Sequence, residues 1–379
     1  MDSYFEKLPS IDEANIKYLE SYVKHLELKQ LSEQTIQTKV WRNYNFLISN
    51  GFKDSKQVTQ DDVENYFIKR RKECSQVTVN GEILEIKLFF RWLVGKETEE
   101  ALFENVKIKR VRSSLPTDQL LTRYDIEKLV NACDRQRDRA IIMLLWDTGA
   151  RIGEIVSLNI GHIEFDRYGA VVIVKGKTGM RRLRLISSVP DLQAWINVHP
   201  LRDRSDAPLF TTFTRYGNGN KRLNHHTIQN MLKRVAQRAN VHKRIHPHAI
   251  RHARLTDLVK NEGGKRGLSE MELRVFAGWE KNSNMPEVYV HLSGGDIERK
   301  MLENAGLIDE DQKQEKTLEP VICPRCKTSN PSSALYCTNC SMVLNQEGAI
   351  DVEESINEAK GSDDYSMLLE KLKKDLGIA

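Results

Sequence analysis

Residues 170–186 read AVVIVKGKTGMRRLRLI, and this stretch distinguishes the chain from an all-helical protein. AVVIV at 170–174 and RRLRLI at 181–186 have the β-branched and alternating patterns of strands, and KGKTGM between them is typical of a hairpin turn. Elsewhere, apolar residues recur at the spacing of amphipathic helices. The expected fold is therefore mainly α with a small β-sheet.

Residues 10–106 are expected to form a helical N-terminal domain. Ser32 and Thr59 occupy positions typical of helix N-caps, and Gly51 and Gly95 follow the last apolar residues of their helices. Basic residues fall on or near the outer faces of these helices, so the domain is either a DNA-binding clamp or an ordinary bundle: Lys69, Arg70, Arg71, Lys72, Lys87 and Arg91.

A basic linker at 107–117 leads to a mixed α+β domain at 118–306, which contains the hairpin. Thr122 is placed to cap its first helix. A short extended piece is expected at 208–213. The later helices of this domain are expected at 225–240, 249–261, 269–277 and 297–305.

Positive charge is concentrated in this second domain. Residues 118–305 contain 31 basic and 21 acidic residues, and 21 of the basic residues are arginines. Residues 306–379 contain 8 basic and 14 acidic residues. Arginine binds phosphate oxygens with two parallel hydrogen bonds, so a nucleic acid is the expected partner. A solvated basic face is the alternative, because a charge bias carries no geometry.

Membrane association is not expected. The sequence lacks an apolar stretch of about 18 residues, the length that a membrane-spanning helix needs. Residues 1–10, MDSYFEKLPS, do not combine a basic patch with an apolar run as a secretory signal does. We therefore expect a cytoplasmic protein.

Two stretches around the hairpin carry cations suited to a phosphate. Residues 148–154 read TGARIGE, in which a glycine turn brings Arg151 to the beginning of a helix, where the dipole favours an anion. The alternative is a helix corner in which Arg151 pairs with an acid. At the hairpin tip, Lys175 or Lys177 could donate a proton to a leaving oxygen, or both could belong to a solvated turn.

The segment 246–252 reads HPHAIRH. His248 and Arg251 are three residues apart, so they share one face of a helix's first turn. A histidine exchanges a proton near neutral pH, and Arg251 would neutralise charge on the same substrate. Three histidines could also hold zinc, but HxHxxxH is a loose pattern and no carboxylate follows closely.

Further along the chain, Gly278-Trp279 precedes Tyr289. A free tyrosine has a pKa of about 10 and is a poor nucleophile at neutral pH. Two arginines and a histidine would favour the phenolate and stabilise a pentacoordinate phosphorus. Taken alone, Tyr289 would be an ordinary core or surface residue.

The ordered set of these motifs resembles the tyrosine recombinase, or phage integrase, family. TGARIGEI is similar to the family's TGxRxxEL box, HAIRH to its HxLRH box, and AGW followed by YVHLS to its LGH and YxHLS boxes. The match covers about 118–305, and the helical 10–95 region resembles the family's core-binding domain.

The resemblance implies a role for each matching residue. Tyr289 would attack a DNA phosphodiester and become joined to the 3′-phosphate, releasing a 5′-hydroxyl. Arg151 and Arg251 would bind the non-bridging oxygens, and His248 would assist as a proton acceptor. Trp279 stands where many members have histidine and would bind phosphate through its indole N–H. Glu154 and His252 resemble supporting residues that orient the others.

The hairpin lysine of the family protonates the leaving oxygen, and two residues of this chain compete for that position. Lys177 begins KTG, which resembles one branch of the family, whereas Lys175 in KGK resembles another. Counting back from Leu183 and Leu185, the apolar pair that anchors the strand, favours Lys177.

The resemblance also implies that the chemistry needs neither a metal nor a nucleotide. Members of the family usually act as four protomers on two DNA duplexes. Residues 297–306, ERKMLENAGL, lie where the family's C-terminal helix docks on a neighbour. A helix that packs in the core of its own chain is the alternative.

Four cysteines near the C-terminus form CxxC–x10–CxxC: Cys323, Cys326, Cys337 and Cys340. Each CxxC places two thiolates on one ion, so a structural zinc ribbon is expected at 320–345. Two disulfides are the alternative, which a reducing cytoplasm disfavours. A helical tail is expected at 350–379, with a helix over 364–376.

The function expected from the whole pattern is that of a site-specific DNA recombinase or integrase, acting on double-stranded DNA for a mobile element. A type IB topoisomerase uses a similar site to relax supercoils and is the nearest alternative. A non-catalytic DNA-binding regulator, in which Tyr289 and the arginines only hold DNA, is the alternative from another class.

Overall fold

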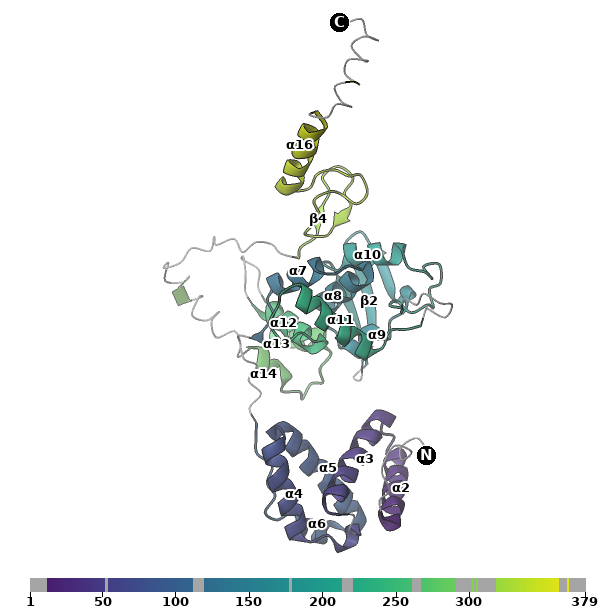
Figure 1. Cartoon of the computed structure of the whole chain (residues 1–379), viewed down its shortest axis with the longest axis vertical. Helices are drawn as coiled ribbons and strands as arrows, with labels where there is room; N and C mark the ends of the chain where they lie inside the picture. The colour runs from purple at the N-terminus through teal and green to yellow at the C-terminus, as the bar shows by residue number, and fades with distance from the viewer. Residues whose placement is uncertain are drawn as a thin grey trace, which may run out of the picture. The chain divides into compact units, whose positions relative to one another are not determined.

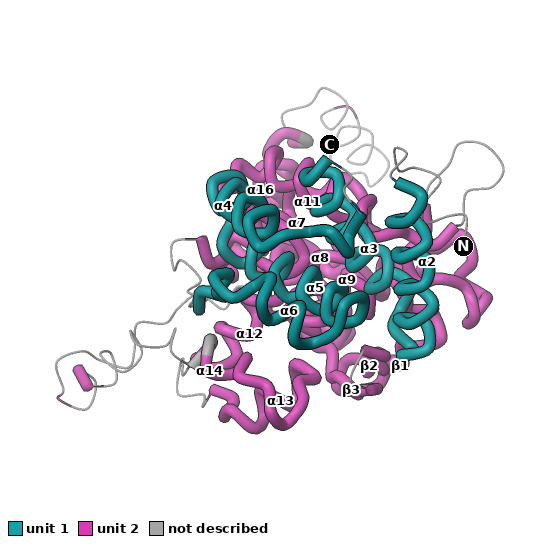
Figure 2. Tube along the Cα trace, turned by 90° about the horizontal axis from the view of Figure 1, so that it is seen from below, with its two compact units in different colours: residues 1–113 teal, residues 114–379 magenta. Residues whose placement is uncertain are grey.

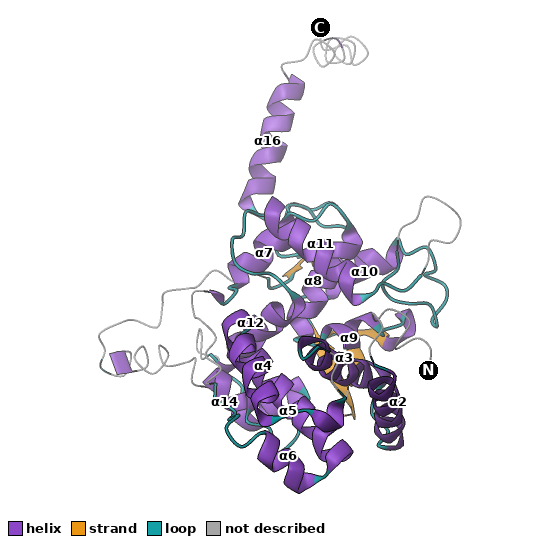
Figure 3. Ribbon diagram, turned by 60° about the horizontal axis from the view of Figure 1, so that its bottom comes forward, coloured by secondary structure: helices purple, strands orange, loops and turns teal. Residues whose placement is uncertain are grey.

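The computed structural model of the chain describes residues 12–51, 54–111, 119–176, 179–212, 221–260, 267–290 and 318–360, together with Met301, Leu302, Ala305 and Met367. The chain divides into two compact units, unit 1 at 1–113 and unit 2 at 114–379 (Figure 2). Helices predominate in the described chain, and its strands belong to unit 2 (Figure 3). This confirms the predicted fold class, mainly α with a small sheet.

Unit 1 is a helical bundle. Ser32 accepts a hydrogen bond from the backbone N–H of Thr35, and Thr59 forms a capping box with Asp62, so both predicted N-caps are present. Gly95 ends its helix with a φ of 87°, a conformation that favours glycine. Buried aromatic and aliphatic side chains fill the core. The helices are α2 (Glu13–Leu28), α3 (Glu33–Ser49), η1 (Ser55–Gln57), α4 (Gln60–Glu73), α5 (Gln76–Val94) and α6 (Lys96–Leu102).

Two buried carboxylates engage half of the cations that the sequence placed on the outer faces of unit 1. Glu82 accepts hydrogen bonds from Arg70 at 2.9 and 2.5 Å. Glu99, which is fully buried, pairs with Arg91 at 2.7 Å and with Lys87 at 3.2 Å. The side chains of Arg70, Lys87 and Arg91 are still 21%, 30% and 48% exposed, so they lie near the surface as predicted, with their charges paired to carboxylates of the bundle.

Unit 2 contains one three-stranded antiparallel sheet in the order β1 (Ile163–Asp166), β2 (Gly169–Gly176), β3 (Gly179–Leu185). The predicted hairpin is β2–β3, with Val172 opposite Leu183, and β1 is an addition that the sequence did not reveal. The expected extended piece at 208–213 is not a strand in its described part, where Pro208 and Thr211 form only isolated bridges.

Helices of unit 2 enclose this sheet on its inner face, which carries Val172, Val174, Leu183 and Leu185 (Figure 1). The central helix α8 is buried along most of its length and packs against α10, α12 and β3. The helices are α7 (Arg123–Asn131), α8 (Gln136–Thr148), α9 (Ile152–Val156), η3 (Ile160–His162), α10 (Val189–Asn197), α11 (His225–Arg238), α12 (Pro247–Val259), α13 (Glu270–Ala277) and α14 (Met285–Val290).

Asp147 at the end of α8 fixes the far end of the hairpin. Its buried carboxylate accepts hydrogen bonds from the backbone N–H groups of Ile186 and Ser188 at 2.7 and 3.0 Å. The end of β3 is therefore held against α8, the helix that precedes Arg151.

A second, smaller core joins α12, α13 and α14. It contains Leu255, Leu273, Ala277 and Tyr289. The predicted helices at 225–240, 249–261 and 269–277 agree with α11, α12 and α13 to within two residues. The helix predicted at 297–305 lies largely outside the described residues.

Leu318 returns the chain to the main core of unit 2, where it is 4% exposed. It is followed by the small sheet of β4 (Val321–Ile322) and β5 (Ser329–Asn330), and then by α16 (Gln346–Lys360). The helix predicted at 364–376 lies outside the described residues, apart from Met367. Among the helices that the structure describes, none has the length and apolarity needed to cross a membrane.

Candidate active site

Arg151 follows a tight turn at the end of α8. Gly149 caps α8 in the left-handed conformation, with a φ of 54°, and Arg151 is the N-cap of α9. The sequence predicted this placement, and it also named an acidic partner as the alternative. Both features are present, because Arg151 lies 3.2 Å from Glu154 and is still about a third exposed.

Glu154 is the buried anion that organises the cations of the site. It accepts a backbone hydrogen bond from Arg151 at 2.9 Å and two side-chain hydrogen bonds from Arg181 at 3.0 and 2.7 Å. Burial alone would raise the pKa of Glu154, but the hydrogen bonds from Arg181 and Arg151 outweigh burial and lower it. Glu154 is therefore a permanent carboxylate.

Arg251 connects three segments of unit 2. It is 5% exposed, and its guanidinium donates to the backbone carbonyls of Gly149 at 2.6 Å and Ala277 at 2.9 Å. Burial, together with Arg151 and Arg181, lowers its pKa to about 10, so it remains a cation at neutral pH. Arg251 thus holds the turn before Arg151 next to the turn before Trp279.

Three histidines occupy the beginning of α12. His246 is the N-cap and accepts a hydrogen bond from Ala249. His248 is exposed at the mouth of the site, and partial burial of its ring, followed by Arg251 and Arg151, lowers its pKa. Burial is also the main reason that the pKa of His252 falls to about 4. Neutral imidazoles are therefore favoured at all three positions.

Tyr289 lies in the small core behind this helix. Its side chain is 0% exposed, and its ring stacks on His252 and Trp279 with centroid distances of 5.6 and 5.5 Å. The Tyr289 hydroxyl lies 2.5 Å from Nδ1 of His252. Burial raises the pKa of Tyr289 to about 12, although Arg251 opposes the increase.

One cavity of about 420 Å³ unites these groups. Six residues that the sequence singled out line it: Arg151, His248, Arg251, His252, Trp279 and Tyr289. Arg251 also lies 5.7 Å from the centre of the Trp279 ring. Cations, proton carriers and a phenol thus surround a space large enough for a phosphate group.

One of the two candidate hairpin lysines lies among the described residues. Lys175 is exposed near the end of β2, whereas Lys177 lies outside the described residues. Gly176 between them approaches Glu154 so closely that a Cβ at this position would lie 2.5 Å from the carboxylate. The tip of the hairpin therefore lies close to Glu154, the anion that organises the arginines.

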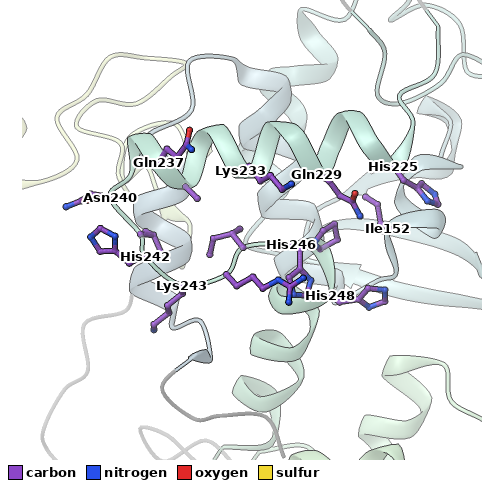
Figure 4. A pocket seen from close by; sticks show the side chains of 15 residues that line it. Ile152, His225, Gln229, Lys233, Gln237, Asn240, His242, Lys243, His246 and His248 are labelled. Carbon is purple, nitrogen blue, oxygen red and sulfur yellow. The ribbon is translucent and has the colours of Figure 1, made fainter. Parts of the chain in front are cut away.

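A larger groove of about 900 Å³ begins at His248 and follows α11 (Figure 4). Its lining includes Lys233, Lys243 and Arg244. Lys243 also pairs with Asp125 at 2.7 Å. The groove provides a basic surface that continues from the reaction cavity along unit 2.

The four C-terminal cysteines converge in a separate centre. Their sulfur atoms lie within 4.8 Å of one another, as ligands of one ion would. Buried Asn330 supports the cluster, because its amide donates to the carbonyl of Thr328 at 2.8 Å and lies 3.7 Å from the sulfur of Cys337. Four thiolates in this arrangement suit zinc and fill its coordination sphere.

The sequence interpretation missed Arg181 and Asp147. Arg181 was visible in principle, because it has the same parity as Leu183 and Leu185 and must therefore point to the inner face of the strand. A charged residue on that face requires a buried partner, which is Glu154. Asp147 gave no such signal, since its partners at Ile186, Ser188 and Arg254 are 39 or more residues away in the chain.

Comparisons with known proteins give matches over the part of the chain that contains this site. Residues 119–294 match the model described as the phage integrase family. The chain is 25% identical over 284 residues to the tyrosine recombinase XerC of Escherichia coli O139:H28, a match that covers 72% of this chain and 91% of that protein. XerC of Escherichia fergusonii gives the same values.

Solved structures show the same fold. A lambda integrase dimer bound to a COC′ core site aligns with a TM-score of 0.55 and 16% identity, covering 73% of this chain and 77% of that chain. The Tn1549 transposon integrase in complex with circular intermediate DNA aligns with a TM-score of 0.54 and 17% identity, covering 77% and 99%.

The fold and the family match together define a class of enzyme. The match at residues 119–294 includes every residue that lines the cavity. The chain is a tyrosine-type site-specific recombinase.

Proposed function

We propose that this recombinase cleaves and rejoins double-stranded DNA through a 3′-phosphotyrosyl bond to Tyr289. The observation that carries the proposal is the single cavity in which Tyr289 meets Arg151, Arg251 and His248. Phosphoryl transfer requires positioning and stabilisation of negative charge more than covalent help from the protein. This cavity supplies both.

Each residue then has a defined task. Arg151 and Arg251 bind the non-bridging oxygens of the scissile phosphate, and His248 at the mouth donates a third hydrogen bond. Trp279 adds its indole N–H and packs against the nucleophile. Glu154 holds Arg151 in place. The bond energy is retained in the phosphotyrosine, so a 5′-hydroxyl of a second strand completes the exchange without a nucleotide or a catalytic metal.

The leaving 5′-oxygen requires a proton, which we assign to Lys177 of the hairpin, with Lys175 as the competing residue. Both lie beside Gly176, which contacts Glu154. The hairpin is thereby connected to the arginine cluster, which supports a lysine from this tip as the acid.

The biological reaction that we favour is integration or excision of a mobile element. The supporting observation is the similarity of the fold to lambda integrase and to the Tn1549 transposon integrase. The XerC relatives are named tyrosine recombinases and not integrases, so they do not add to this choice. We further propose that residues 10–106 form the core-binding clamp, that 118–306 catalyse, and that four protomers form the synapse. DNA as the substrate implies a cytoplasmic location.

The test uses the full chain and a pool of nicked duplexes with a randomised core. Covalent protein–DNA complexes are captured on a denaturing gel, and the enriched duplexes identify the site. We expect the complex with the wild-type chain and none with Tyr289→Phe. A covalent complex that persists in Tyr289→Phe would refute the assignment. Relaxation of a plasmid without strand exchange would favour a topoisomerase, and binding without any covalent complex a regulator.

We also propose that Cys323, Cys326, Cys337 and Cys340 hold one structural zinc ion in a ribbon at 320–345, followed by the helical tail at 350–379. The ion supplies folding energy to a segment that has little core of its own. The net negative charge of the segment after 306 argues for a protein partner. One zinc per chain is expected by elemental analysis, falling in Cys326→Ser but unchanged in Cys74→Ser, a cysteine outside the cluster.

A further inference from the structure

The hydroxyl of Tyr289 contacts His252, and not His248, the histidine that we assign to the phosphate. Nδ1 of His252 lies 2.5 Å from the Tyr289 oxygen, and the two rings stack at 25°. His248 is one turn earlier on α12 and is exposed at the cavity mouth. The two histidines therefore face different atoms of the reaction.

We propose that His252 is a catalytic residue of this enzyme, which accepts the proton of Tyr289 when the tyrosine attacks the phosphate. This inference rests on the proposed function of Tyr289 as the nucleophile. It assigns His248 to the phosphate oxygens alone and gives the second histidine of HAIRH the proton transfer.

The proposed transfer requires one of the two tautomers of His252. A tyrosine hydroxyl can donate or accept a hydrogen bond, so the 2.5 Å contact is compatible with either tautomer. The transfer uses the tautomer that carries its proton on Nε2, because Nδ1 then has the lone pair that faces the Tyr289 hydroxyl.

Each bond that forms in this step is matched by a bond that breaks, and each proton has a donor and an acceptor. The O–H bond of Tyr289 breaks, and its proton bonds to Nδ1 of His252. The oxygen lone pair forms a bond to phosphorus while the bond from phosphorus to the 5′-oxygen breaks. The leaving oxygen takes a proton from the hairpin lysine. In the rejoining step the lysine recovers its proton from the attacking 5′-hydroxyl, and His252 returns its proton to Tyr289.

Substrate is needed before this transfer becomes favourable. Without DNA, the pKa of Tyr289 is about 12 and that of His252 about 4, so the proton stays on the phenol. Burial depresses the pKa of His252 first, followed by His248, Arg251 and His246. A phosphodiester bound to Arg251 and His248 brings a negative charge that offsets these neighbours. Bond formation to phosphorus also makes the phenol proton acidic.

A tyrosine analogue with a more acidic hydroxyl distinguishes a proton acceptor at position 252 from a residue with only a structural role. His252→Asn keeps a carbonyl that can accept the hydrogen bond of Tyr289, but an amide cannot take up a proton. The full chain is prepared with tyrosine or 2,3-difluorotyrosine at position 289, in the wild-type, His252→Asn and His248→Asn backgrounds. Covalent complex formation is measured with the nicked duplex selected above, and DNA affinity is measured in parallel.

We expect His252→Asn to slow cleavage by about 10²- to 10⁴-fold, the usual contribution of a proton-transfer group, with DNA affinity unchanged. In the His252→Asn background, 2,3-difluorotyrosine at position 289 should raise the cleavage rate at least about tenfold, because its more acidic hydroxyl needs less help from a base. The loss in His248→Asn should be the same with either nucleophile. Equal losses with both nucleophiles in His252→Asn, or cleavage close to the wild-type rate, would overturn the proposal.

A DNA-free measurement separates this inference from the proposed function. The ¹⁹F resonance of 3-fluorotyrosine at position 289 should shift in His252→Phe, which keeps an aromatic ring but removes the acceptor, and less in His252→Asn. Identical resonances in all three proteins would refute the contact. Folding of each variant is checked by its thermal transition, and His252→Gln replaces His252→Asn if the latter is destabilised.

Discussion

Glu154 and Arg181 form a two-point ion pair behind the reaction cavity, with N–O distances of 3.0 and 2.7 Å. Their side chains are 4% and 10% exposed. The same sheet carries a second pair, Arg184 on β3 with Asp166 on β1, whose side chains are 34% and 39% exposed. In this pair one guanidinium nitrogen donates to both carboxylate oxygens at 2.7 Å, so the two pairs differ in geometry as well as in surroundings.

This contrast predicts unequal contributions to stability. Glu154→Gln leaves the buried charge of Arg181 without its counter-ion and should lower the free energy of unfolding by about 3–5 kcal/mol. Asp166→Asn should have a far smaller effect, because water screens the exposed pair. Urea denaturation, followed through the transition of unit 2, measures both. Similar losses in the two variants would contradict the prediction.

Gly176 is predicted to be essential for a reason other than backbone conformation. A Cβ at this position would lie 2.5 Å from Glu154, so Gly176→Ala must displace the carboxylate and the arginines that it holds. We expect cleavage to fall by about 10²-fold, the usual cost of misplacing a catalytic group by 1 Å.

Gly153→Ala is the matched control for this change. Its Cβ would meet His225 at 3.6 Å, an ordinary contact, within α9. Alanine is favoured over glycine in a helix by about 1 kcal/mol, so this variant should be slightly more stable and retain its activity. Equal loss of cleavage in the two alanine variants would show that the contact with Glu154 is not the cause.

The histidines of α12 predict a loss of stability in mild acid. The pKa values of His246, His248 and His252 are all lowered from 6.5 in the folded protein. The unfolded chain therefore binds more protons than the folded chain below pH 6.5, so the free energy of unfolding falls as the pH decreases.

For His252, the free energy of unfolding continues to fall until the pH reaches its folded pKa of about 4. Thermal unfolding between pH 7.5 and 4.5 should show a steep dependence that His252→Asn reduces. An unchanged slope in this variant would show that His252 does not contribute to it.

Salt dependence should separate the cations of unit 1 that are accessible to DNA from those that hold the bundle. Lys69 is 69% exposed and lies 4.0 Å from the exposed carboxylate of Glu73, whereas Lys87 pairs with buried Glu99. With non-specific duplex DNA, Lys69→Ala is expected to reduce the slope of log K against log salt by about 0.9, the value for one phosphate contact. Lys87→Ala should leave the slope unchanged and destabilise the protein. The opposite result would restore Lys87 as a DNA contact.

The sequence was most informative where a local rule decides the structure. The caps at Ser32, Thr59 and Thr122, the hairpin of β2 and β3, and the turn before Arg151 each depend on residues that lie close together in the chain. The catalytic set could be proposed because its motifs keep their order, and the structure brings Arg151, Arg251 and Tyr289 to one cavity.

Interactions between distant segments could not be predicted in this way. The strand β1 acquires its role only by pairing with β2, and its four residues, IEFD, are too short a run for their alternation to predict a strand. The contact of His252 with Tyr289 spans 37 residues and depends on how α14 packs against α12. Likewise, the ion pairs on the basic faces of unit 1 could not be predicted, because Glu82 and Glu99 reach their partners only after the helices have packed.

Tyr289 and Leu318 are both buried in unit 2, and residues 291–317 lie between them in the sequence. The chain is thus anchored in unit 2 on either side of these residues. A single backbone cut between the two anchors would leave two fragments, each with a buried side chain in unit 2. The fragments should therefore stay together under native conditions and separate only when unit 2 unfolds.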